Sequence, residues 1–187
     1  MRIASFILLF ISSITIARAE NNVNLFVSGG LTTGGDTLAE TNDGTKLKAG
    51  GLIYFAVGIN LTISQKLTIQ SSLGYHFDSL DADNGYADYS RTFIEVLPFY
   101  KFSDTFRVGL GVSYIMSPEY DSSWNNVKFA NTTSPILELN WRGATDSIWW
   151  GLRYLSTDLE VEKINNYSFS AEKLDGSYLG FMVHFYF

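Results

Sequence analysis

The sequence predicts an all-β fold, an eight-stranded antiparallel up-and-down transmembrane β-barrel. Three observations predict it. Strand-like segments alternate apolar and polar residues with a period of two, their connections alternate between short and long, and aromatic residues gather at the segment ends. Short turns at one end and longer loops at the other are typical of membrane barrels. The absence of Cys excludes disulfides, and the 16 Gly, 14 Phe and 11 Tyr favour strands over helices.

Eight strands are expected, in chain order, at residues 24–31, 51–63, 67–77, 91–102, 105–116, 135–141, 147–157 and 177–187. The short connections are 64–66, 103–104 and 142–146, and the long ones are 32–50, 78–90, 117–134 and 158–176. Both termini then lie at the short-turn end of the barrel, which is the periplasmic end in membrane barrels of this kind.

The alternation separates each strand into an apolar row and a row of small or polar residues. In the second strand the apolar row is Ile53, Phe55, Val57, Ile59, Leu61 and Ile63. In the third it is Leu67, Ile69, Leu73, Tyr75 and Phe77, and in the fifth Phe106, Val108, Leu110, Val112, Tyr114 and Met116. The fourth strand is less regular, because Phe93, Leu97 and Phe99 share the row of Arg91, Glu95 and Lys101.

The seventh strand places Ile148, Trp150, Leu152 and Tyr154 on one face, and the eighth places Leu179, Phe181, Val183, Phe185 and Phe187 on one face. A secreted lipocalin-like barrel with the same strand count would turn these rows inward and need a charged outer surface. The opposite rows here are mostly Gly, Ser, Thr, Asn and Gln, which suit a narrow polar lumen better. We therefore expect the apolar rows to face lipid, with aromatic girdles at both ends of the strands.

The first 19 residues have the layout of a secretory signal peptide: Arg2, a short apolar stretch, and Ala17-Arg18-Ala19 before Glu20. The apolar stretch is shorter than the ~20 residues that a membrane-spanning helix needs. The expected division is a signal peptide at 1–19 and one barrel domain at 20–187. The formal charge of −6 becomes −8 once Arg2 and Arg18 leave with the leader, which disfavours nucleic acid as a partner.

Together with the leader, the strand count, the alternating loops and terminal Phe187, stretches such as Gly74-Tyr75-His76-Phe77-Asp78 and Arg107-Val108-Gly109-Leu110-Gly111 resemble the small eight-stranded outer-membrane barrels of the OmpA/OmpX type. The resemblance covers the mature chain. It implies a location in the outer membrane of a Gram-negative bacterium, contact with membrane lipid and lipopolysaccharide, and assembly through a C-terminal strand ending at Phe187. It also implies a structural or surface-interaction role for a monomer.

The polar rows supply a candidate network inside the lumen, made of Arg107, Glu95, Glu138, Lys101, Arg142, Arg153, His76 and His184. Buried charges are costly unless paired, so each glutamate should contact an arginine. Small residues beside Arg107 leave room for its side chain to cross the lumen, and we expect it to pair with Glu95, Glu138 or both. An eight-stranded lumen filled by these side chains should not act as an open pore.

Two other functions are considered: a narrow channel for small solutes and a lipid-modifying hydrolase or acyltransferase. The enzyme would require a serine and a carboxylate beside a histidine, and Ser72, Asp78 and Ser79 are near His76 in sequence. No nucleophile motif surrounds them. The acidic segment 78–88 does not match the spacing of a calcium loop. The sequence therefore predicts no catalytic residue, no metal site and no cofactor.

Overall fold

The computed structural model describes residues 22–82, 85–165, 167–168 and 172–187. The expected signal peptide lies outside these residues. The strands are β1 (Val23–Thr33), β2 (Thr37–Glu40), β3 (Lys46–Lys48), β4 (Ile53–Thr62), β5 (Leu67–Ala82), β6 (Gly85–Ser103), β7 (Phe106–Ser122), β8 (Asn126–Phe129), β9 (Thr132–Arg142), β10 (Ile148–Leu155), β11 (Asp158–Ile164), β12 (Tyr167–Ser168), β13 (Lys173–Asp175) and β14 (Tyr178–Tyr186). No helix in the described part of the chain is long and apolar enough to cross a membrane.

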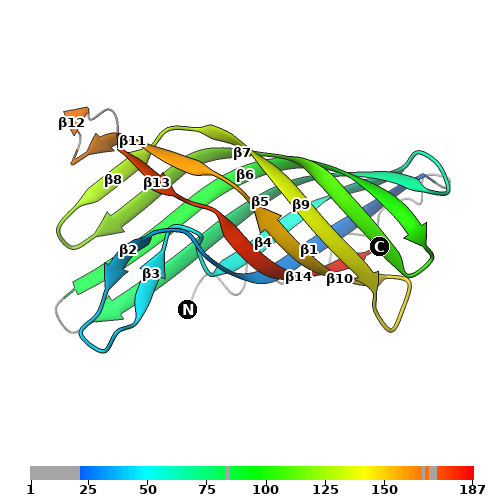
Figure 1. Cartoon of the computed structure of the whole chain (residues 1–187), viewed down its shortest axis with the longest axis horizontal. Helices are drawn as coiled ribbons and strands as arrows, with labels where there is room; N and C mark the ends of the chain where they lie inside the picture. The colour runs from blue at the N-terminus through cyan, green and yellow to red at the C-terminus, as the bar shows by residue number, and fades with distance from the viewer. Residues whose placement is uncertain (1–21, 83–84, 166, 169–171) are drawn as a thin grey trace.

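Eight of these strands form a closed antiparallel barrel in the order β1, β4, β5, β6, β7, β9, β10 and β14, and β14 pairs with β1 to close it. The predicted fold class is confirmed. Figure 1 shows the tilted strands and the C-terminus near the short-turn end on the right. At this end the Phe187 amide donates to the carbonyl of Leu25 on β1.

Three strands, β5, β6 and β7, extend five or six residues beyond their expected ends, and the region 78–90 is not a long loop as predicted. β5 and β6 continue through it as a hairpin and pair as far as Ala82 and Gly85. β7 likewise extends to Ser122 and pairs with β8. In the sequence analysis, these strands were expected to end where the apolar residues of their outer rows end. Beyond the membrane the outer row becomes polar while the backbone stays extended, so the apolar pattern marks the limit of the membrane rather than of the strand.

The expected inside–outside assignment is confirmed. The outer rows of the barrel expose large apolar side chains all round, including Phe55, Leu73, Leu110, Leu152 and Phe181, which are 42–67% exposed. The opposite rows are buried. A belt of this kind would be unstable in water and is suited to a bilayer, where exposed side chains must be apolar and every backbone group must be paired.

Above the belt, the strand extensions and the β2–β3 hairpin enclose a second apolar core. Its buried members are Leu47, Ala49, Ala87, Tyr89, Phe129, Leu159 and Val161. We call this group the outer cap. It lies at the long-loop end of the barrel, which Figure 1 shows on the left.

Candidate functional site

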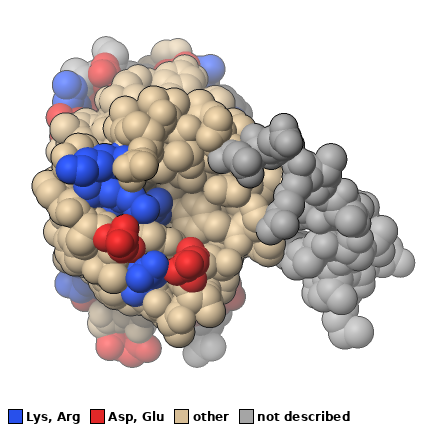
Figure 2. Space-filling view, turned by 90° about the vertical axis from the view of Figure 1, so that its right-hand side faces the viewer, with Lys and Arg blue, Asp and Glu red and all other residues tan. Residues whose placement is uncertain are grey.

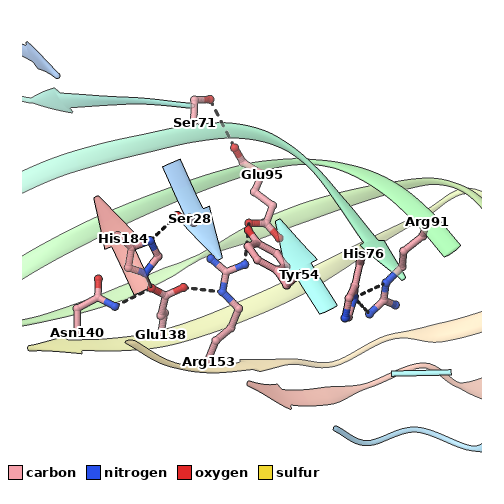
Figure 3. A network of polar contacts seen from close by, with 10 residues as sticks. All are labelled: Ser28, Tyr54, Ser71, His76, Arg91, Glu95, Glu138, Asn140, Arg153 and His184. Carbon is pink, nitrogen blue, oxygen red and sulfur yellow. Dashed lines mark hydrogen bonds and ion pairs between the residues drawn. The ribbon is translucent and has the colours of Figure 1, made fainter. Parts of the chain in front are cut away.

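The centre of the lumen is crossed by one arginine that contacts two glutamates. The register of β9 and β10 places Arg153 directly opposite Glu138. Arg153 Nε donates to Glu138 Oε2 at 2.5 Å, and its Nη1 donates to Glu95 Oε2 at 2.9 Å (Figure 3). The Tyr54 hydroxyl also donates to Glu95 Oε2, at 2.9 Å. All three charged side chains are at most 3% exposed, so this is a buried ion network joining β6, β9 and β10.

A polar cluster continues this network toward the short-turn end. His184 Nε2 lies 2.8 Å from Glu138 Oε1, and His184 Nδ1 lies 2.6 Å from Ser28 Oγ. Asn140 Nδ2 donates to the same oxygen, Glu138 Oε1, at 2.6 Å. Glu138 therefore has partners on both carboxylate oxygens and is fully buried.

Ser28, His184 and Glu138 are the residue types of a hydrolytic triad, but their surroundings do not suit catalysis. Ser28 is 2% exposed and His184 is fully buried in the barrel interior. A nucleophile must reach the reacting atom of a substrate. Here the serine lies in the middle of β1 and is buried in the barrel interior, so the cluster connects β1, β9 and β14 and leaves the hydroxyl almost no exposed surface.

His76 lies in a different polar group, nearer the outer cap. Arg91 Nε and Nη2 lie 3.1 and 2.9 Å from His76 Nδ1, which must accept and therefore carries no proton. His76 Nε2 lies 2.7 Å from Thr32 Oγ1, and Arg91 Nη1 donates to the carbonyl of Gly176. No serine or carboxylate of the described residues hydrogen-bonds to His76, so the considered arrangement with Ser72, Asp78 or Ser79 is absent there.

The predicted pairing of Arg107 with the two glutamates is wrong. Glu138 lies opposite Gly109, and Glu95 lies opposite Ser113, so both carboxylates are displaced along β7 from Arg107. Arg153, not Arg107, faces them.

Arg107 is instead held by neutral groups. Its Nε donates to Asn140 Oδ1 at 3.0 Å, and its Nη2 donates to the Tyr186 hydroxyl. The guanidinium carbon lies 4.4 Å from the centre of the Phe99 ring and 4.3 Å from that of Trp149. Stacking on aromatic faces is a favourable environment for a guanidinium.

Two other predicted members lie outside the buried network. Lys101 is half-buried, and Arg142 pairs with exposed Asp146 at 2.8 Å. Both line a cavity at the short-turn mouth of the barrel. Figure 2 looks onto this end and shows positive and negative side chains close together near its centre.

The outer end of the molecule is acidic. Segments 34–52, 78–90, 117–131 and 158–176 contain 14 of the 19 acidic residues of the chain and only five basic ones. Some of the acids accept hydrogen bonds from neighbouring strands: Ser79 donates to Asp88, and Tyr86 donates to Asp121. The acids face outward around the outer cap because its interior is apolar.

Sequence reasoning missed several lumen residues that the structure brings together. Arg91 was placed on the inner row but not among the network charges, and Asn140 and Tyr178 were not singled out. Tyr178 packs edge-on against His76, with ring centres 5.0 Å apart, and lies 5.2 Å from the Arg91 guanidinium. The alternation of apolar and polar residues shows that these side chains point into the barrel. Their position along the barrel axis, and so which of them meet, depends on the register of the strands.

No protein-family model matches the chain, and the search of curated proteins found no match either. Among solved structures, it is similar to Ail, the attachment invasion locus protein of Yersinia pestis, solved in complex with the heparin analogue sucrose octasulfate. The TM-score is 0.51 at 10% identity, and the match covers 89% of this chain and 98% of Ail. It is also similar to the N-terminal β-barrel domain of Pseudomonas aeruginosa OprF, with a TM-score of 0.50 at 12% identity, covering 89% and 98%.

The chain has the fold of a small outer-membrane β-barrel. Its apolar belt gives this fold the surface that a bilayer requires, and small barrels of this fold lie in the outer membrane. At 10–12% identity these similarities show the fold but assign no ligand to this barrel.

Proposed function

We propose that this outer-membrane barrel is a closed membrane anchor that presents an acidic extracellular β-structure to a positively charged partner. The observation that carries the proposal is the outer cap: strands β5, β6 and β7 continue beyond the apolar belt and pack there around their own core. A barrel that served only as a membrane-spanning structure would not need this second core.

The lumen supports an anchor rather than a channel. The side chains of Arg153, Glu95 and Glu138 meet in its centre, and the outer cap closes its upper end. An eight-stranded barrel has an interior only wide enough to be filled by side chains. Passage of a solute would require breaking a buried ion network, which costs several kcal/mol.

The charge of the outer end supports a basic partner. Excess acid around the outer cap creates a negative potential, which accelerates association with positive surfaces and opposes it with negative ones. Ail was crystallised with a sulfated heparin analogue. The acidic surface of this chain favours the opposite charge, so we expect no comparable affinity for heparin.

Binding tests this directly. The full chain in lipid nanodiscs should bind a poly-lysine peptide with an affinity that falls steeply with salt, and should not bind heparin. A variant with Asp158, Glu160 and Glu162 changed to Ser should bind the peptide more weakly. A control with Asp104 and Asp146 changed to Ser, at the opposite mouth, should bind it like the unchanged protein. Equal affinity for peptide and heparin would contradict the proposal.

Conductance tests the closed lumen. In planar bilayers the purified protein should show no large, steady single-channel currents. Such currents would instead support the second function considered above, a narrow channel for small solutes.

The remaining expectations accompany this proposal. We infer that the protein is a monomer without enzymatic activity, that its belt contacts lipid and lipopolysaccharide, and that the strand ending at Phe187 is recognised by the barrel-assembly machinery. Comparing lipid A from cells with and without the protein by mass spectrometry tests the enzymatic alternative, and no difference is expected.

A further inference from the structure

The short-turn mouth of the barrel contains a cavity of about 280 Å³ that the proposed function does not use. Its lining comes from all eight barrel strands and two turns, and its charged members are Lys101, Asp104, Arg107, Arg142 and Asp146. Because Arg142 and Asp146 pair with each other, the charges left facing the cavity are two positive and one negative.

Arg107 lies at the inner end of this cavity as a buried cation without a carboxylate. It is 4% exposed, and no acidic residue of the described chain lies within ion-pair distance of it. Asn140 and Tyr186 accept from its Nε and Nη2, whereas its Nη1 has no hydrogen-bond partner among the described residues. The Phe99 and Trp149 rings fix the plane of the guanidinium, so its free edge keeps a set direction.

Two neutral side chains in the same cavity also lack partners. Asn60 Oδ1 and Thr68 Oγ1 are buried and make no hydrogen bond within the described residues. The Asn60 side chain is 5% exposed, and that of Thr68 is 9% exposed. A buried polar atom without a partner costs about 1–3 kcal/mol, so a group in the cavity that hydrogen-bonds to these two atoms would be stabilised there.

We propose that this cavity is a binding site for a small oxyanion, a phosphate or carboxylate group, that enters from the periplasm. The free edge of Arg107 and the ammonium of Lys101 would bind its negative oxygens, since charge-assisted hydrogen bonds are the strongest available here. The Thr68 hydroxyl can donate to it, and Asn60 Oδ1 can accept from a protonated oxygen. The site is a dead end, because Glu138 and Arg153 fill the lumen above it.

The oxyanion could be a free ion or the phosphate group of an inner-leaflet phospholipid. Two parallel titrations distinguish these two sources. The ¹⁵N-labelled full chain in maltoside micelles, which carry no phosphate, is titrated with sodium phosphate in one arm and with phosphatidylglycerol in the other. The Nε–H signal of Arg107, assigned by its loss in Arg107→Gln, is followed by NMR. Sodium chloride at equal ionic strength is the reference.

We expect a saturable shift of the Arg107 signal in one arm and none with chloride. Lys101→Gln should weaken the binding about tenfold, the equivalent of one charge-assisted hydrogen bond. Thr68→Val should weaken it severalfold and still fold, because it removes a hydroxyl that has no protein partner. Ser113→Ala is the matched control: it also removes a buried hydroxyl without a partner, but outside the cavity, and should bind like the unchanged protein.

Two results would overturn the site. One is a change of the Arg107 signal that rises linearly with concentration and is equal for phosphate, phospholipid and chloride. This result would indicate that water fills the mouth and that the added ions act only by screening charge. The other is unchanged affinity in both Lys101→Gln and Thr68→Val, which indicates binding elsewhere.

Discussion

Arg153 on β10 lies directly opposite Glu138 on β9 and also reaches across the lumen to Glu95 on β6. One side chain thus connects strands that are not all neighbours in the barrel. Such a contact fixes the relative height of the strands, because a slip of register would leave charges unpaired. We therefore expect the buried network to hold the strands of the barrel in register.

Removing the shared cation should destabilise the barrel strongly. Arg153→Met leaves Glu95 and Glu138 buried without their shared arginine, and we expect a loss of roughly 3–5 kcal/mol of unfolding free energy. Urea unfolding followed by heat-modifiable gel migration measures it. Arg142→Met is the control, since its pair with Asp146 is largely exposed and should contribute at most about 1 kcal/mol. If Arg153→Met and Arg142→Met lost the same unfolding free energy, the buried network would stabilise the barrel no more than an exposed ion pair does.

Double-mutant cycles should separate the two lumen arginines. The cycle of Arg153→Met with Glu138→Gln should give a coupling free energy of roughly 1–3 kcal/mol, as residues in one ion network do. The cycle of Arg107→Met with Glu95→Gln should give about zero, since these side chains make no contact. A large coupling in the second cycle would restore the pairing first expected from the sequence and contradict the geometry.

The interior should not tolerate a methyl group at Gly74. A Cβ there would lie 2.2 Å from the Phe93 ring and 2.5 Å from the backbone oxygen of Phe55. Gly74→Ala should therefore cost roughly 1–3 kcal/mol of unfolding free energy through overpacking. At Gly29 a Cβ would meet only one atom, at 4.0 Å, so Gly29→Ala should be close to neutral in the same urea titration. If both variants unfold at the same urea concentration, the packing at Phe93 is looser than described.

Ser28 should be chemically inert despite its histidine and glutamate neighbours. Because it is buried in the filled lumen, a fluorophosphonate probe should not label the folded protein. Mass spectrometry of tryptic peptides after labelling checks this, with Ser28→Ala as the comparison. Specific labelling of Ser28 in the folded barrel would reopen the hydrolase alternative.

The sequence predicted the closed barrel, its eight transmembrane strands and the direction of each row, because lipid imposes one rule on every outward position. It could not predict which lumen charges meet. Two residues on neighbouring inner rows, such as Arg107 and Glu138, can lie at the same or at different heights, and only the register decides. The outer cap was missed for a related reason: its strands follow the rules of a protein in water, where a polar outer row resembles a loop.

The β2–β3 hairpin should be held to the outer cap mainly by Leu47. Its two strands pair only with each other, and Leu47 is fully buried in the cap. A backbone hydrogen bond from the Asp36 amide to the Asp175 carbonyl adds a further attachment at its base. Leu47→Ala removes the apolar anchor at a cost of about 2–5 kcal/mol, which a small hairpin cannot offset.

We therefore expect trypsin, added to intact cells, to cleave Leu47→Ala at Lys46 or Lys48 and to cleave the unchanged protein there much more slowly. Heat-modifiable migration should persist, because the lumen network is untouched. Asn42→Ala, at the exposed tip of the same hairpin, should behave like the unchanged protein. Local opening of this kind would show that the outer cap is a separately stable layer on the membrane barrel. Loss of heat-modifiable migration in Leu47→Ala would show instead that the cap and the barrel unfold as one unit.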